Sequence, residues 1–256
     1  MLARRAVIKG LATGVAGHLL ARILADPTLA RAAAADLSTI NLTTAGGRSV
    51  HAALAEPGRK PAPTVLLVHE WWGLNDQIKA VAADLAAKGY WALAVDLYDG
   101  RVTADPTEAH TYMNDVDPRA VRDILASWID WLRKRDVASD KLGTVGWCFG
   151  GGWSLNASLI RSVDATVVYY GDVAKSAAEL ATLSGPVLGH FATHDGWITR
   201  DMVSGFEREM SKAGKALTSY WYDAQHAFAN PTAGRYDEED AALAWTRTLA
   251  FFDANL

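Results

Sequence analysis

The sequence has 256 residues, half of them hydrophobic, so it can bury the core of one large domain. Lys and Arg total 25 against 29 Asp and Glu, so the chain lacks the basic excess that nucleic-acid binding requires. The single cysteine, Cys148, excludes an intramolecular disulfide and a cysteine-rich zinc site.

The first 35 residues have the layout of an export signal. Positive charges at Arg4, Arg5 and Lys9 precede a mostly apolar run that ends in small residues, and the basic part resembles a twin-arginine signal. Polar residues interrupt the apolar run, which argues against an integral membrane span. We expect residues 1–35 to be a twin-arginine-type signal, and residues 36–256 to be a periplasmic domain of formal charge −8 rather than −4. An amphipathic helix that stays attached to a cytoplasmic protein is the alternative.

From residue 36 onward, strand-like and helix-like segments alternate. Gly46 and Gly47 supply the tight turn of an N-terminal β-hairpin. β-branched runs favour strands, and apolar residues three and four positions apart favour helices. The predicted strands are 38–44, 49–55, 64–69, 90–95, 142–145, 165–170, 186–192 and 217–222, and the predicted helices are 76–88, 116–135, 149–160, 200–213 and 236–252.

This alternation is typical of an α/β fold whose mainly parallel sheet has helices on both faces. Residues 107–117 are interpreted as a connection. The sequence contains no internal repeat and no second linker, so it predicts one domain, most simply a monomer.

The stretch from Gly146 to Gly150 fits the nucleophile elbow Gly-x-nucleophile-x-Gly, with Cys148 in the place that serine usually holds. The elbow is a strained turn between strand and helix, where glycines avoid collisions of Cβ atoms. It puts the sulfur at a helix N-terminus, which favours a thiolate. The alternative, a structural cysteine beside a glycine-rich turn, explains less of the pattern.

A cysteine nucleophile needs a base and a residue that orients the base. In elbow-containing hydrolases the chain order is nucleophile, acid, histidine. Asp195 follows strand 186–192 and His226 follows strand 217–222, so both are expected at the same sheet edge as Cys148. Three other acids remain open as partners of the histidine: Asp172, Asp201 and Asp223.

His190, His194 and Asp195 could also suggest metal ligands. Residues four apart converge on a helix, but strand geometry over residues 186–192 makes these side chains diverge. The sequence therefore predicts no metal site, and we expect no cofactor.

Five blocks in order give the chain, over nearly all of residues 38–256, a resemblance to the dienelactone hydrolase family of α/β hydrolases. The blocks are 68–75, 88–98, 146–151, 169–171 and 225–228. The resemblance implies that Cys148 is the nucleophile, His226 the general base and Asp195 its orienting carboxylate. It also implies that Glu70 contacts the resting thiol and is displaced when substrate arrives.

The expected reaction is attack of the Cys148 thiolate on the carbonyl of a small-molecule lactone or ester. The elbow makes the backbone N–H of Phe149 one oxyanion donor, and the resemblance implies that Trp71 N–H is the second. A lactone suits cysteine because its tethered oxygen can leave as an enolate.

The substrate-binding residues are harder to predict. Family members that take dienelactones hold the substrate carboxylate with arginines, and Asn230 stands where one of these is expected. A neutral amide cannot replace the charge-assisted contact of arginine, which puts an anionic substrate in doubt. We expect Trp72, Trp147 and Trp197, together with Asn230, to form the substrate-binding surface, although core packing also explains such aromatics.

Two other functions remain open. A broader carboxylesterase or thioesterase has the same site residues and differs in pocket shape. A thiol sensor or binding module keeps the elbow only as scaffold.

Overall fold

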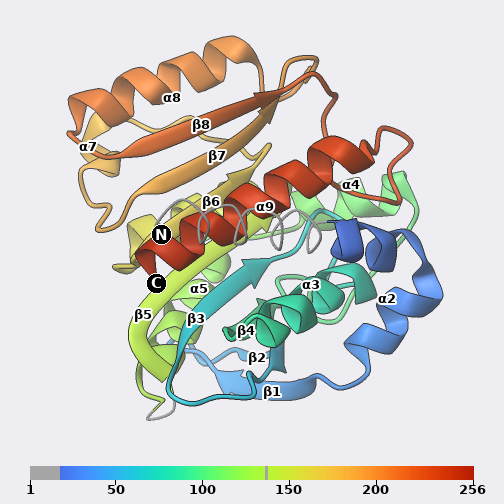
Figure 1. Cartoon of the computed structure of the whole chain (residues 1–256). Coiled ribbons are helices and arrows are strands. Elements are labelled where there is room, and N and C mark those ends of the chain that lie inside the picture. The colour runs from blue at the N-terminus through green and yellow to red at the C-terminus, as the bar shows by residue number, and fades with distance from the viewer. Residues whose placement is uncertain (1–17, 136–137) are drawn as a thin grey trace, which may run out of the picture.

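Eight strands form one sheet within residues 18–135 and 138–256, which the computed structural model describes (Figure 1). The strand order is β1-β2-β4-β3-β5-β6-β7-β8. β2 pairs antiparallel with both β1 and β4, whereas the other neighbouring pairs are parallel. The bounds are β1 Ser38–Thr43, β2 Ser49–Ala55, β3 Ala62–Val68, β4 Trp91–Val95, β5 Ala138–Trp147, β6 Ala165–Tyr169, β7 Val187–Ala192 and β8 Leu217–Tyr222.

Helices cover both faces of this sheet (Figure 1). Their bounds are α2 Pro27–Ala34, α3 Asp76–Ala87, α4 Pro106–Asn114, α5 Pro118–Arg133, α6 Phe149–Ile160, α7 Ala177–Leu180, α8 Arg200–Lys212 and α9 Glu238–Asn255. Alternate residues of β3 face opposite layers: Val65 and Leu67 pack with α3 and α9, whereas Leu66 and Val68 pack with α5. All four are fully buried, as expected for a parallel strand between two helical layers.

The predicted hairpin, the mainly parallel sheet and the helices on both faces are confirmed, with element ends that differ by a few residues. The prediction of a connection at residues 107–117 is wrong, because α4 occupies most of it. α4 buries only Ala109, so its apolar periodicity is weak. Its local signals were nevertheless present: Asp105 caps the helix by accepting the N–H groups of Thr107 and Glu108, and Pro106 follows the cap.

Residues 1–35 are predicted to be a signal outside the fold, yet residues 18–25 and α2 are helical, and α2 lies against α3. Leu20 is buried, and the carbonyl of Leu24 accepts a hydrogen bond of 3.2 Å from Gln77 Nε2. Arg31 also lies 3.6 Å from the carboxylate of Asp76. In the described part of the chain, no helix combines the length and apolar character needed to cross a membrane.

Candidate active site

The turn between β5 and α6 holds Cys148 in a strained conformation. Its φ of 52° lies in the left-handed region, which a non-glycine residue rarely adopts. A Cβ on Gly146 would lie 2.0 Å from the Gly150 carbonyl oxygen, and a Cβ on Gly150 would lie 2.3 Å from the Val68 carbonyl oxygen. Gly146 is therefore required where β5 turns into α6, and Gly150 is required where α6 passes close to β3.

A chain of hydrogen bonds connects Cys148, His226 and Asp195. His226 Nε2 lies 3.1 Å from the sulfur, and Nδ1 of the same ring lies 2.7 Å from Asp195 Oδ2. The three residues follow β5, β8 and β7, so they meet at the carboxyl edge of the sheet as predicted from the chain order. The arrangement can move a proton from the thiol to the imidazole while the carboxylate keeps the ring oriented.

The loop after β7 fixes the carboxylate of Asp195. Its Oδ1 accepts the backbone N–H groups of Trp197 at 2.8 Å and Ile198 at 3.0 Å, which leaves Oδ2 for His226. Burial alone would raise the pKa of Asp195, but the hydrogen bonds from His226 and the two N–H groups outweigh it and lower that pKa. Asp195 therefore stays ionised beside the imidazole.

Cys148 is protonated in the resting site. Burial raises the pKa of its thiol to about 12, and the nearby charges of Glu70 and Asp195 add to the rise. A hydrogen bond from the Phe149 backbone N–H and the positive charge of Arg235 act in the opposite direction. The N-terminal position on α6 therefore does not by itself produce a thiolate.

Glu70 lies buried at the end of β3, bonded to two side chains for which sequence reasoning foresaw no such contact. Its carboxylate accepts hydrogen bonds from Asn230 Nδ2 and from the Tyr170 hydroxyl, the latter at 3.4 Å. Burial raises the pKa of Glu70 to about 7, and the two hydrogen bonds limit that rise. In this arrangement Glu70 acts on Cys148 through its charge, while the sulfur is bonded to His226.

Tyr170 could have been found from its position, because it follows β6 at the sheet edge where the site residues gather. Its φ of 36° turns the chain there, and its ring packs edge-on against the His226 ring at 5.1 Å. Asn230 is buried as well, and its carbonyl oxygen accepts the N–H and hydroxyl of Thr232. Its amide is thus engaged with Glu70 and Thr232, and contact with substrate stays a prediction.

The two predicted oxyanion donors belong to different parts of the fold. The Phe149 N–H belongs to the first residue of α6, and its proximity lowers the pKa of the Cys148 thiol. Trp71 follows Glu70 in a turn that the Gly73 N–H closes on the Glu70 carbonyl at 3.3 Å. Within the described chain, the Trp71 N–H donates to no protein acceptor, which leaves it free for a ligand oxygen.

The predicted tryptophans differ in exposure. Trp197 is 61% exposed, its ring lies edge-to-face with the His226 ring at 5.0 Å, and the Arg235 guanidinium lies over the Trp197 ring at 5.1 Å. Trp72 is half-buried and packs on the ring of Trp71 at 4.7 Å. Trp197 is therefore the most exposed of the predicted tryptophans, and it lies beside His226.

Trp147 is buried and lines an apolar cavity of about 50 Å³ that also touches Glu70. The cavity wall includes Leu20 and Leu24 of the N-terminal helical segment, together with Ile78 of α3. This space holds a few water molecules at most, so a substrate does not fit in it in this arrangement.

The alternative partners and ligands considered from the sequence lie apart. His190 is fully buried in β7 and bonds Tyr222 and Thr248, and burial lowers its pKa to about 3. His194 is exposed and lies 2.8 Å from Asp223. Among the described residues, no group of three or more His, Cys, Asp or Glu side chains is arranged to hold a metal ion.

Comparisons with known proteins agree with this architecture. The dienelactone hydrolase family model matches residues 50–256. A probable 2-oxo-3-(5-oxofuran-2-ylidene)propanoate lactonase of Bradyrhizobium sp. is 30% identical over 224 residues, which are 80% of this chain and 89% of that protein. A carboxymethylenebutenolidase of Pseudomonas putida is 27% identical over 226 residues, 83% of this chain and 94% of its own.

Among solved structures, m3DLH superimposes with a TM-score of 0.77 at 25% sequence identity, covering 86% of this chain and 99% of its own. The family match spans most of the sequence, and the sheet order and helices are those of the α/β-hydrolase fold. The chain therefore belongs to the dienelactone hydrolase family of hydrolases.

Proposed function

We propose that this protein hydrolyses a lactone or ester bond through Cys148 as nucleophile, His226 as general base and Asp195 as the carboxylate that orients the base. The observation that carries the proposal is the continuous hydrogen-bonded chain from the sulfur through the imidazole to the carboxylate, built on a strained elbow. A structural cysteine needs neither the strain nor the two partners.

In the first half of the reaction, His226 Nε2 takes the thiol proton as the sulfur attacks the carbonyl carbon. A C–S bond forms, and the carbonyl electron pair moves onto oxygen, where the N–H groups of Phe149 and Trp71 stabilise it. Collapse breaks the bond to the leaving oxygen, which receives the proton from His226 and leaves a thioester on Cys148. His226 then deprotonates a water molecule that attacks the thioester, releasing the carboxylic acid and the thiol.

Glu70 restrains this chemistry until substrate is bound. Its negative charge raises the pKa of Cys148, so any substrate that excludes or neutralises the carboxylate makes the thiol easier to ionise. Asn230 and Tyr170 hold the carboxylate while the sulfur is bonded to His226.

A neutral lactone or ester is the substrate class that fits best. Asn230 stands where an arginine is expected and donates a hydrogen bond to Glu70, and its neutral amide offers no positive charge to a substrate carboxylate. The exposed face of Trp197 beside His226 suits an apolar group. The lactonase named among the relatives supports a lactone as the bond that is cleaved.

The same residues also serve a broader carboxylesterase or thioesterase. A substrate panel separates the two: an enol lactone with and without a carboxylate, a short aryl ester and an acyl thioester. The lactone proposal predicts the highest kcat/KM for the neutral lactone. Aryl ester turnover far above lactone turnover would favour the esterase.

The role of the triad is tested with Cys148→Ala and Asp195→Asn, the latter expected to lower kcat by roughly 100-fold or more because it disturbs the orientation of the base. Function that persists in Cys148→Ala would instead support a thiol sensor or binding module.

We also propose that the protein is exported, on the basis of the charge and apolar pattern of residues 1–35. N-terminal sequencing of protein from separated cell fractions tests this. Periplasmic protein that begins near residue 36 is expected, whereas intact residues 1–35 on protein found only in the cytoplasm would overturn the proposal.

A further inference from the structure

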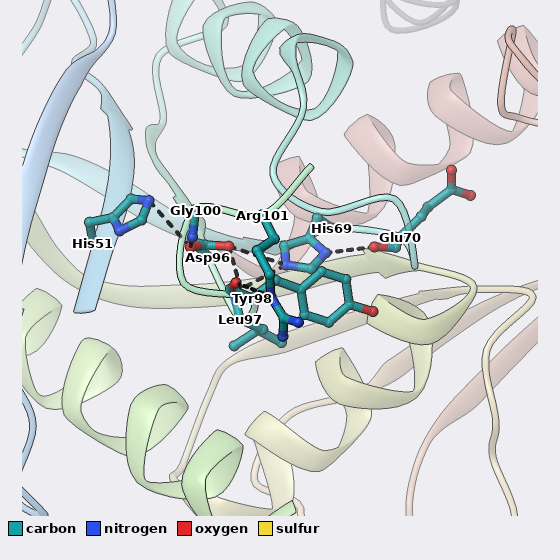
Figure 2. Close-up of polar contacts among 8 residues, drawn as sticks. All are labelled: His51, His69, Glu70, Asp96, Leu97, Tyr98, Gly100 and Arg101. Atoms are coloured by element: carbon teal, nitrogen blue, oxygen red, sulfur yellow. Dashed lines mark hydrogen bonds and ion pairs between the residues drawn. The ribbon is translucent and has the colours of Figure 1, made fainter. Parts of the chain in front are cut away.

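His69 lies fully buried at the end of β3, directly before Glu70, and takes no part in the proposed proton transfer (Figure 2). Its ring is packed against the Tyr98 ring at 4.7 Å and the Phe149 ring at 6.1 Å. A buried imidazole in contact with the elbow residue Phe149 requires an explanation, because a hydrophobic side chain would fill the same space without polar atoms to satisfy.

The hydrogen bonds of His69 define which nitrogen carries its proton. Burial lowers the pKa of this imidazole, so the ring is neutral and has one donor and one acceptor. The backbone N–H of Leu97 lies 3.1 Å from Nε2, which makes Nε2 the acceptor. Nδ1 therefore carries the proton and donates to the Glu70 carbonyl oxygen at 2.6 Å (Figure 2).

That carbonyl shares one planar peptide unit with the N–H of Trp71, so fixing the C=O fixes the direction of the N–H. The bond from His69 is shorter than the second bond to this oxygen, which comes from the Gly73 N–H at 3.3 Å. We infer that His69 is a positioning residue that aims the Trp71 N–H at the substrate oxyanion. This inference rests on the proposed function, in which Trp71 supplies the second oxyanion donor.

Asp96, at the end of β4, supports His69 from the other side (Figure 2). Its carboxylate accepts the backbone N–H groups of Tyr98 and Gly100 and lies 3.2 Å from Nε2 of His51 on β2. At 3.8 Å from His69 Nε2, the Asp96 carboxylate is too distant for a hydrogen bond. It acts instead by shaping the turn that presents the Leu97 N–H, which sets the tautomer of His69.

A matched pair of variants tests the inference. Asn and Leu have nearly the same shape, but only His69→Asn keeps a donor near the position of Nδ1. Two rates on Cys148 are measured in each: acylation by p-nitrophenyl acetate, which develops an oxyanion, and alkylation by iodoacetamide, which does not. Because loss of one oxyanion donor costs roughly 100- to 1000-fold, misalignment in His69→Leu is expected to slow acylation at least 10-fold relative to His69→Asn. The alkylation rates of the two variants, and their KM values for p-nitrophenyl acetate, are expected to agree within about threefold.

Equal acylation rates in the two variants, or a parallel loss of alkylation, would overturn the role of His69. If thermal melting shows that His69→Leu does not fold, His69→Phe takes its place, since its ring keeps the contacts with Tyr98 and Phe149 and also lacks the donor. Absence of acylation in the unmodified protein would contradict the proposed function itself. If the unmodified protein is acylated and the variant without the donor is acylated at the same rate, only the inference about His69 is contradicted.

Discussion

His226 Nε2 lies 3.1 Å from the sulfur of Cys148, although the pKa of that thiol is raised to about 12. A thiol with this pKa is almost fully protonated at neutral pH, so the resting pair is a thiol donor and an imidazole acceptor. Reactivity of the sulfur then depends on transfer of its proton to His226. This dependence distinguishes the site from one in which a helix N-terminus alone generates a thiolate.

Removal of the His226 imidazole is therefore expected to make the Cys148 thiol much less reactive. At pH 7.5, His226→Gln should lower the rate of iodoacetamide alkylation of Cys148 by roughly 10-fold or more, because no group remains to accept the proton. Mass spectrometry of the modified peptide gives the rate. His194→Gln is the matched control, since His194 is an exposed histidine paired with Asp223, and it should alkylate like the unmodified protein. Equal alkylation in both variants would contradict the dependence on His226.

Glu70→Gln should have the opposite effect on the thiol. The Glu70 charge raises the pKa of Cys148, so its removal should speed alkylation at pH 8, where the carboxylate with a pKa of about 7 is ionised. One pKa unit corresponds to about tenfold in thiolate population, which sets the scale of the gain. At pH 5.5, where Glu70 is protonated, the two proteins should differ little. Slower alkylation of Glu70→Gln at both pH values would instead mean that Glu70 assists deprotonation.

The same variant should change how stability depends on pH. The pKa of Glu70 rises from 4.5 to about 7 on folding, so between these values the native state keeps a proton that the unfolded state has lost. The free energy of unfolding therefore falls as pH rises through this window, by up to about 3 kcal/mol from this group. Glu70→Gln has no carboxyl group at this position and lacks this loss of stability. Relative to the unmodified protein, the urea midpoint of Glu70→Gln should therefore be higher at pH 8 than at pH 4.5. If the difference in urea midpoint between the two proteins were the same at both pH values, the raised pKa of Glu70 would be contradicted.

The close approach of α6 and β3 predicts a steep cost for one methyl group. Gly150→Ala would put a Cβ 2.3 Å from the Val68 carbonyl oxygen, which must shift the backbone and is expected to cost more than about 3 kcal/mol. Gly205→Ala in α8 is the control, because its Cβ would meet only Arg208 at 3.7 Å and alanine favours a helix by about 1 kcal/mol. Denaturant unfolding compares the two. Equal midpoints would show that the elbow is less tightly packed than described.

The positions of the main site residues could be predicted because parallel strands bring their carboxyl ends to one edge. The elbow glycines locate Cys148 at the end of β5, and chain order then places Asp195 after β7 and His226 after β8. Each of these inferences uses local sequence and one topological rule. No other information was needed to place Cys148, Asp195 and His226 at one edge of the sheet.

The hydrogen bonds to the Glu70 carboxylate could not be predicted in the same way. Tyr170 and Asn230 reach it from positions 100 and 160 residues away in the sequence, and the pairing depends on how three loops pack. The inferred role of His69 could not be predicted either, because it depends on the backbone N–H of Leu97, which follows the neighbouring strand β4. Helix α4 was not predicted for a different reason: it buries too few apolar residues to produce a helical pattern in the sequence.

The most direct test of the account is to trap the acyl-enzyme intermediate. Protein mixed with p-nitrophenyl acetate and quenched within the first turnover is digested and examined by mass spectrometry, with Cys148→Ala as control. The account predicts one acetyl group on the peptide that contains Cys148, removable by hydroxylamine as a thioester and absent from Cys148→Ala. Ester turnover that persists in Cys148→Ala, or acetylation found only at other residues, would contradict it.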